Sequence, residues 1–94
     1  MKKVTLFYLE GCPYCHHARK AVAELQKENK DYADIGVNWV EEDDHPEISS
    51  QYDYYYVPTI FFGDRKLYEA NPSENYQDCK HKVQQAFEAV LAYE

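Results

Sequence analysis

The sequence predicts an α/β fold in which a four-stranded mixed sheet carries helices on both faces. Three observations lead to this prediction: short apolar runs bounded by turn residues, two long stretches with apolar residues every three to four positions, and one tight hairpin turn. Along the chain these segments give the order β-α-β-α-β-β-α. We interpret residues 1–94 as a single domain, because no linker, repeat or low-complexity tract divides the sequence.

The first strand and the first helix are joined by a tight turn. Lys3–Leu9 is a mostly apolar run, typical of a strand that is buried on both faces, and Gly11 follows it. Pro13 suits the first position of a helix, which predicts that Cys12 is the N-cap residue. The helix continues to about Lys30. Its apolar face is formed by Cys15, Ala18, Val22 and Leu25, and the residues off that face include His16, Arg19, Lys20, Glu24 and Lys27.

The middle of the chain predicts a second strand, a short helix and a hairpin. The second strand covers Val37–Val40, and Pro46 opens a short helix that extends to Tyr52. Val57–Phe62 is typical of a third strand, and Gly63–Arg65 forms a turn into the fourth strand, Lys66–Glu69. Because a helix connects the first two strands, they are expected to be parallel, whereas the hairpin is antiparallel.

The last helix carries a start signal in the sequence. Asn71 can act as its cap, Pro72 fits the first helical position, and Glu74 stands where the acid of a capping box belongs. The apolar stripe that follows consists of Tyr76, Cys79, Val83, Phe87 and Val90.

Charge and hydropathy restrict the partners and the location. A net charge of −7 argues against nucleic acid as a partner, because phosphate binding needs clustered basic residues. The apolar stretch Val4–Leu9 is shorter than the ~7–15-residue core of a signal peptide and far shorter than the ~20 residues of a membrane span. We therefore expect a cytoplasmic monomer that does not contact a membrane. In that compartment structural disulfides are rare, which favours reactive roles for cysteines.

Residues 12–15 form a C-P-Y-C motif, which can be a redox dithiol, half of a zinc site or, with His16 following, a haem attachment point. Haem attachment needs export and a second axial ligand, yet the only methionine is Met1. Zinc could draw on Cys12, Cys15, His16, His17 and Cys79. No second C-x-x-C or H-x-x-x-H lies at ligand spacing, so we predict no metal site.

The C-P-Y-C motif after the first strand, together with Val57-Pro58-Thr59 before the third, resembles the glutaredoxin branch of the thioredoxin superfamily. The resemblance covers nearly the whole chain and implies a thioredoxin-like fold of the glutaredoxin type. It also implies an enzyme, a thiol–disulfide oxidoreductase in which Cys12 and Cys15 are catalytic. In that family the proline is cis and faces the dithiol, and the resemblance implies the same position and conformation for Pro58.

The two cysteines are suited to different steps. At the helix N-terminus, Cys12 faces free N–H groups and the positive end of the helix dipole, and both favour a thiolate that attacks a substrate disulfide. Cys15, one turn later on the inward face, is expected to resolve the mixed disulfide. Tyr14 is expected to project outward, and the backbone of Val57 to pair with an extended substrate. The predicted substrate-binding residues are Pro13, Tyr14, Tyr56, Val57 and Pro58.

The chain departs from the family at the glutathione site. Glutaredoxins usually have a lysine shortly before the first cysteine, and a Gly-Gly turn with an aspartate after the last strand. Here Leu9–Gly11 and Glu69–Glu74 occupy those places, and the acids would repel a glutathione carboxylate. The expected substrate is a disulfide-containing protein or small molecule, and the electron donor is glutathione or a flavoprotein disulfide reductase, without a bound cofactor.

Two other functions stay open: metal or iron–sulfur cluster binding, and a non-catalytic, redox-gated interaction module on the same fold. For the remaining candidates we expect structural roles. Cys79 lies in an apolar stripe and is expected to pack in the core. His16, His45 and His81 are expected at the surface, and His17 has no assigned role. Of the tyrosines between Tyr52 and Tyr56, about half are expected to pack and the others to line a substrate groove.

Overall fold

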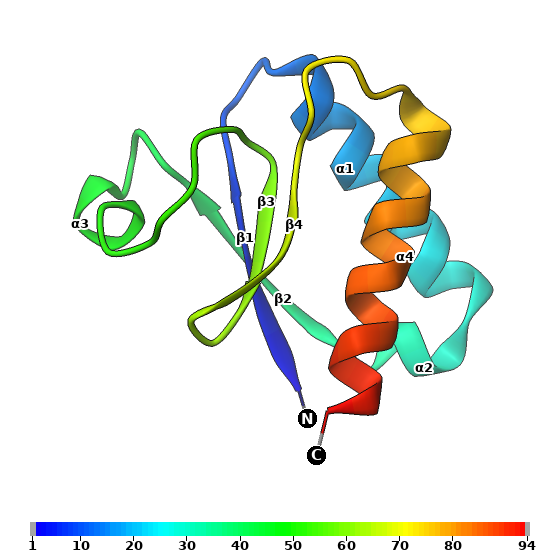
Figure 1. The fold of residues 1–94 in the computed structure, drawn as a ribbon. Helices are drawn as coiled ribbons and strands as arrows, with labels where there is room; N and C mark the ends of the chain where they lie inside the picture. The colour runs from blue at the N-terminus through cyan, green and yellow to red at the C-terminus, as the bar shows by residue number, and fades with distance from the viewer. Residues whose placement is uncertain (1, 94) are drawn as a thin grey trace.

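The computed structural model describes residues 2–93 and confirms the predicted fold class. In chain order the elements are β1 (Lys3–Tyr8), α1 (Pro13–Glu28), α2 (Lys30–Ala33), β2 (Gly36–Glu41), α3 (Pro46–Ser49), β3 (Thr59–Phe62), β4 (Arg65–Glu69) and α4 (Tyr76–Ala92). The strands lie in the order β2-β1-β3-β4 (Figure 1). β1 is parallel to β2 and the β3–β4 hairpin is antiparallel, as predicted. The structure adds that β1 and β3 pair antiparallel.

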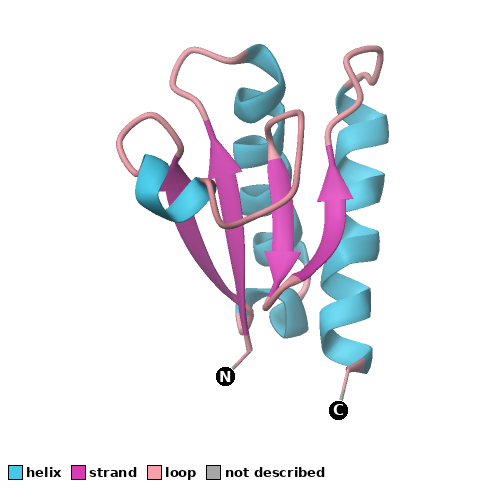
Figure 2. Ribbon diagram, turned by 60° about the vertical axis from the view of Figure 1, so that its left-hand side comes forward, coloured by secondary structure: helices cyan, strands magenta, loops and turns pink. Residues whose placement is uncertain are grey.

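The helices lie on both faces of the sheet, because alternate residues of each strand point to opposite sides. Val4 and Leu6 of β1 pack with α1 and α4 in the larger core cluster. Phe7 points the other way and joins Val40 and Phe61 in a smaller cluster, against which α3 and the segment after it pack. Figures 1 and 2 show the short helix α3 on one side of the strands and the long helices on the other. Among residues 2–93, no helix has both the length and the apolar character needed to cross a bilayer.

The first helix ends slightly earlier than predicted, at Glu28. Asn29 adopts an extended conformation with ψ 118°, which interrupts the helix. Its side-chain oxygen then accepts a hydrogen bond from the Asp31 N–H at 2.9 Å and caps the short helix α2. Sequence periodicity continues across this break, so it did not reveal a separate α2.

The predicted third strand and the predicted short helix are both too long. β3 begins at Thr59 rather than Val57, because Pro58 has no N–H to donate to a strand ladder. Its carbonyl instead accepts a hydrogen bond from the Ala70 N–H at 2.9 Å. α3 ends at Ser49 rather than Tyr52, whose ring turns inward to lie 4.8 Å from that of Phe7.

The last helix starts later than predicted, at Tyr76 instead of Pro72. The Asn71–Glu74 segment forms a turn closed by a 2.9 Å hydrogen bond from the Glu74 N–H to the Asn71 carbonyl. The capping box that starts α4 is formed by Asn75 and Asp78. The predicted start at Pro72 was wrong: Glu74 does accept from the Asn71 N–H at 3.0 Å, but its other oxygen bonds the Tyr68 hydroxyl in the core, and the complete capping box lies at Asn75.

Candidate active site

Cys12 lies at the N-terminus of α1, as predicted. The turn from β1 passes through Gly11, whose φ of +77° favours glycine over other residues. The Cys12 N–H donates to the Leu9 carbonyl at 3.4 Å, and the Cys12 carbonyl accepts from the His16 N–H at 3.0 Å. The Cys12 side chain is half-buried and makes no capping hydrogen bond. The thiol is therefore available to a reaction partner at the positive end of the helix dipole.

Cys15 is buried beneath this turn, only 5% exposed, which confirms the predicted inward position. Its sulfur accepts a hydrogen bond from the Leu9 N–H at 3.4 Å. Burial raises the pKa of the Cys15 thiol to about 12, with further raising contributions from a hydrogen bond to Cys12 and from the charges of Cys12 and Glu42. Cys15 therefore stays protonated at neutral pH in the reduced protein.

The third cysteine, Cys79, is fully buried in α4, as predicted. Its sulfur lies 3.4 Å from the Tyr68 hydroxyl, which donates a hydrogen bond to it. Burial raises the pKa of Cys79 to about 11, a further contribution coming from the charge of Glu74. Neither the position nor the acidity of this thiol suits a reactive group.

The two buried thiols predict a loss of stability in alkaline solution. Their ordinary pKa is 9.0, and the folded-state values are about 12 for Cys15 and about 11 for Cys79. Between pH 9.0 and the folded-state pKa of each thiol, the unfolded chain binds fewer protons than the folded protein. The free energy of unfolding therefore falls as the pH rises through this range. Each thiol contributes a slope of about 1.4 kcal/mol per pH unit. Urea unfolding at several pH values above 9 measures this slope.

The variant Cys79→Ala is the matched test, since it removes one of the two thiols. We expect its free energy of unfolding to fall less steeply with pH than that of the unmodified protein. Equal slopes for the two proteins would contradict the assignment of Cys79 as a buried, protonated thiol.

Val57 and Pro58 lie at the same end of the sheet as the dithiol. Thr59 pairs with Phe7 in the antiparallel register of β1 and β3, so the residues before Thr59 lie beside the C-terminal end of β1. The Val57–Pro58 peptide bond is cis and Pro58 is buried. Within residues 2–93 the N–H and C=O of Val57 have no backbone hydrogen-bond partner. They are therefore available to an added strand.

A carboxylate of β4 holds the loop before Pro58. Oε2 of Glu69 accepts hydrogen bonds from the N–H groups of Tyr55 and Tyr56 at 2.5 and 2.8 Å. Its other oxygen forms an ion pair with Lys66 at 2.7 Å. The Tyr55 and Tyr56 side chains are 86% and 53% exposed. The sequence analysis missed Glu69, because nothing in the pattern of β4 shows that its side chain bonds Tyr55 and Tyr56 in a distant loop.

Half of the neighbouring tyrosines pack, as expected, but the two exposed ones do not line the groove beside Cys12. Tyr52 and Tyr54 pack against Phe7 and Phe61, whereas Tyr55 and Tyr56 are open to solvent.

Tyr14 does not project outward as predicted: it is half-buried, because its hydroxyl and its ring both find partners within the chain. Its hydroxyl donates to the Pro72 carbonyl in the turn between β4 and α4. Its ring meets that of His17 edge to face, with centroids 6.5 Å apart, and His17 in turn meets Tyr76 at 5.6 Å. Pro13, the second residue of the C-P-Y-C turn, is exposed. The side chains of His16, His45 and His81 are also exposed, as predicted.

A groove of about 360 Å³ runs beside the dithiol, between the end of β1 and the first turns of α1. It is lined by Tyr8, Leu9, Glu10, Gly11, Cys12, Pro13, Cys15, His16, His17 and Arg19. A substrate that reaches Cys12 can extend into this groove.

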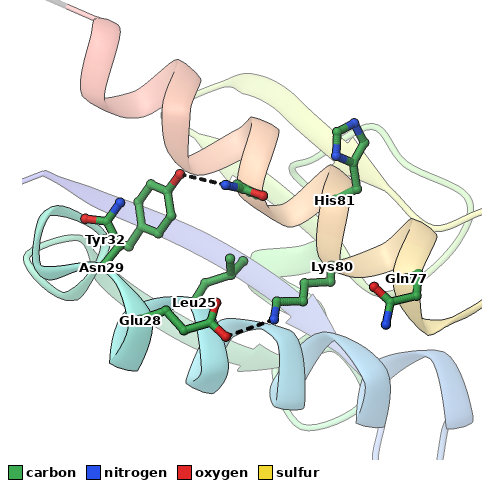
Figure 3. A pocket seen from close by; sticks show the side chains of 8 residues that line it. Leu25, Glu28, Asn29, Tyr32, Gln77, Lys80 and His81 are labelled. Atoms are coloured by element: carbon green, nitrogen blue, oxygen red, sulfur yellow. Dashed lines mark hydrogen bonds and ion pairs between the residues drawn. The ribbon is translucent and has the colours of Figure 1, made fainter.

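A second cavity of about 440 Å³ lies between α1 and α4, at the end of α1 remote from Cys12 (Figure 3). Two pairs of its polar groups are bonded to each other: Lys80 pairs with Glu28 at 3.2 Å, and Gln84 donates to the Tyr32 hydroxyl at 3.2 Å. In the part of the chain that the structure describes, no three His, Cys, Asp or Glu side chains gather closely enough to hold a metal ion.

Comparison with known proteins gives one sequence family and several similar structures. A sequence model of the glutaredoxin family matches residues 4–67. No curated protein matches the sequence significantly. A malarial protein of known structure is 17% identical with a TM-score of 0.59, and the alignment covers 89% of this chain and 94% of that one.

Two thioredoxins have similar folds. A point-mutant thioredoxin from Halobacterium salinarum NRC-1 is 20% identical with a TM-score of 0.57, over 90% of this chain and 74% of that one. Thioredoxin 1 of the thermophilic eubacterium Thermosipho africanus TCF52B is 16% identical with a TM-score of 0.56, over 93% and 96% of the two chains. At these identities the similarity establishes the fold, which is thioredoxin-like.

Proposed function

The chain belongs to the glutaredoxin family, and from this premise we propose that it reduces disulfides through a dithiol cycle of Cys12 and Cys15. Family membership and fold support a role in thiol oxidoreduction. The observation that carries the specific proposal is the pairing of an accessible thiol at the N-terminus of α1 with a buried thiol one turn later. Such a pair can give up two electrons to a substrate by forming a disulfide within one turn of helix.

The proposed reaction has two exchange steps. In the first, the Cys12 thiolate attacks one sulfur of the substrate disulfide, a Cys12–substrate disulfide forms, and the other substrate sulfur leaves as a thiolate that takes up a proton. In the second, the Cys15 thiol loses its proton and attacks Cys12, so that a Cys12–Cys15 disulfide forms and the substrate leaves as a thiol. Two electrons pass to the substrate. Glutathione or a flavoprotein disulfide reductase then returns two electrons to the Cys12–Cys15 disulfide.

The raised pKa of Cys15 separates the two steps. Because Cys15 is protonated in the reduced protein, only Cys12 is positioned to attack an incoming disulfide. Once Cys12 is in a mixed disulfide, its sulfur can no longer ionise, so the contribution of its charge to the raised pKa of Cys15 disappears. Formation of the mixed disulfide thus favours deprotonation of the resolving thiol.

The docking surface in this proposal consists of Pro13, Tyr14, Tyr56 and Val57, with the buried Pro58 beneath it fixing the direction of the Val57 backbone. The free backbone groups of Val57 support a short strand-like pairing with the substrate chain. The hydrogen bonds that the Tyr55 and Tyr56 N–H groups donate to Glu69 support a fixed position for the loop that carries Tyr56.

A turnover assay tests the proposed function and its electron donor together. Reduction of hydroxyethyl disulfide is measured in parallel with glutathione and with a thioredoxin-reductase system. We expect catalytic turnover with at least one donor, and saturation at low glutathione concentration would identify glutathione as that donor. Turnover with neither donor, in a protein that is folded and fully reduced, would overturn the proposal.

A further inference from the structure

The loop between α3 and β3 is irregular and leads into the cis peptide bond of Val57 and Pro58. Among residues 2–93, no backbone–backbone hydrogen bond involves any residue of the segment 53–57. Irregular backbone of this kind samples many conformations unless side chains hold it. The side chains that fasten the loop therefore decide where the free backbone groups of Val57 lie.

Two charged side chains of β4 fasten this loop. The Glu69 carboxylate accepts hydrogen bonds from the N–H groups of Tyr55 and Tyr56 at 2.5 and 2.8 Å. The Lys66 ammonium lies 2.7 Å from the other Glu69 oxygen and donates to the Asp53 carbonyl at 3.5 Å. Burial opposes ionisation of Glu69, but Lys66 and the two N–H groups hold the pKa of its carboxyl below the ordinary value. Glu69 is thus charged at neutral pH, which strengthens the hydrogen bonds that it accepts.

The residue after Glu69 holds the other side of Val57. The Ala70 N–H donates to the Pro58 carbonyl at 2.9 Å, so two consecutive residues bind the chain before and after Val57. The Val57 side chain packs against the smaller core cluster, while its N–H and C=O have no backbone partner within residues 2–93. The free groups of Val57 therefore belong to a loop that is held on both sides.

We propose that Glu69 is a positioning residue, which holds this loop in the conformation that pairs with an extended polypeptide beside the reacting disulfide. The inference rests on the proposed function and names the residue that sets its affinity for polypeptide substrates. Glu69 acts through the loop and not on the reacting sulfurs. Without its carboxylate, the pairing conformation is populated only part of the time, and the apparent affinity falls by that fraction. A small disulfide with no chain to pair depends on Glu69 much less.

The test compares Glu69→Ala with Glu28→Ala. Glu28 is also a carboxylate paired with a lysine, Lys80 at 3.2 Å, but it lies at the end of α1 remote from Cys12. Two neutral substrates are used: hydroxyethyl disulfide, and the disulfide-linked dimer of a short blocked peptide with a central cysteine. We expect Glu69→Ala to raise KM about tenfold for the peptide, with kcat nearly unchanged, and less than about threefold for hydroxyethyl disulfide. Glu28→Ala is expected to leave both substrates within about twofold.

A second variant and a second peptide show whether the effect passes through the loop. Glu69→Gln keeps an oxygen that can accept from Tyr55 and Tyr56 but loses the charge, so its KM for the peptide should lie between those of Glu69→Ala and the unmodified protein. A peptide N-methylated beside the cysteine lacks the N–H that pairs with the Val57 carbonyl, so Glu69→Ala should impair it little further. The proposal is overturned by an equal loss for both substrates, by an unchanged KM for the peptide, or by a full additional loss for the methylated peptide.

Two measurements do not depend on turnover and so separate this inference from the proposed function. Amide hydrogen exchange of Tyr55 and Tyr56, followed by NMR, is expected to be faster in Glu69→Ala than in the unmodified protein or Glu28→Ala. The dissociation constant of the blocked peptide with serine in place of cysteine is expected to rise about tenfold in Glu69→Ala alone. Both changes together support the positioning role even if the protein reduces no disulfide. Unchanged exchange, or faster exchange without weaker binding, overturns it.

Discussion

Replacing Cys12 by serine is expected to abolish disulfide reduction. A hydroxyl is a far weaker nucleophile than a thiolate at neutral pH, and no other cysteine can take its place, because Cys15 and Cys79 are buried and their pKa values are raised to about 12 and about 11. We expect kcat/KM to fall at least ~1,000-fold, equivalent to about 4 kcal/mol of transition-state stabilisation. The reduction of hydroxyethyl disulfide, measured under single-turnover and steady-state conditions, gives this value.

Cys79→Ala is the matched control, because it also removes one thiol but lies outside the candidate site. Its activity is expected to stay close to that of the unmodified protein. If Cys12→Ser kept a substantial fraction of the activity while remaining folded, the nucleophile would have to be another group, and the assignment of Cys12 would be wrong.

The second large effect concerns Glu74, whose side chain is 2% exposed. Its carboxylate accepts hydrogen bonds from the Tyr68 hydroxyl at 2.5 Å and the Asn71 N–H at 3.0 Å, and Lys82 lies 3.5 Å away. Glu74→Ala leaves the buried Tyr68 hydroxyl and the part-buried Asn71 N–H without this acceptor. We expect a loss of about 3 kcal/mol in the free energy of unfolding, seen as a fall of more than about 10 °C in Tm.

Two variants separate the buried hydrogen bonds from helix capping. Glu74→Gln keeps an oxygen acceptor of similar size and is expected to lose only about half as much stability as Glu74→Ala. Asp78→Ala breaks the exposed capping box of α4 and is expected to cost under about 1 kcal/mol. If Glu74→Ala were as mild as Asp78→Ala, the buried network would not stabilise the fold.

Glu74 also connects stability to the candidate site. The turn that it holds includes Pro72, whose carbonyl accepts from Tyr14, and follows Ala70, whose N–H donates to Pro58. Loosening this turn therefore releases two neighbours of the dithiol at once. We expect Glu74→Gln to raise KM for hydroxyethyl disulfide more than it lowers kcat, because it disturbs positioning rather than the reacting sulfurs.

The arrangement of the dithiol was predictable because its determinants are local. An apolar run followed by Gly11 and Pro13 specifies a strand, a tight turn and a helix start, and helical periodicity turns Cys15 inward. The strand directions and the faces of the helices followed from general rules of connection and needed no knowledge of side-chain contacts.

The role of Glu74 could be predicted only in part. The Asn71–Glu74 spacing matches a capping box, and one carboxylate oxygen of Glu74 does accept a hydrogen bond from the Asn71 N–H at 3.0 Å. The segment is nevertheless a turn, and the other oxygen accepts from the Tyr68 hydroxyl in the core. That second partner comes from β4, so only the tertiary structure reveals it.

Arg19 illustrates a second limit. Its place off the apolar stripe indicates an exposed side chain, which is correct, but the rings that fix it belong to β1 and β2. Tyr8 and Trp39 are brought together by the parallel register of those strands, in which Leu6 pairs with Trp39. The sequence of α1 alone therefore does not predict the contact of Arg19 with Tyr8 and Trp39.

Trp39 is the only tryptophan of the chain, and it lies against the arginine at the rim of the groove. Indole fluorescence responds to the electric field and the collisional quenching that a neighbouring charge produces. Any molecule that draws the Arg19 guanidinium toward itself will alter the light that this single chromophore emits. The protein thus contains a natural optical reporter of groove occupancy, which allows binding to be followed without attaching a dye.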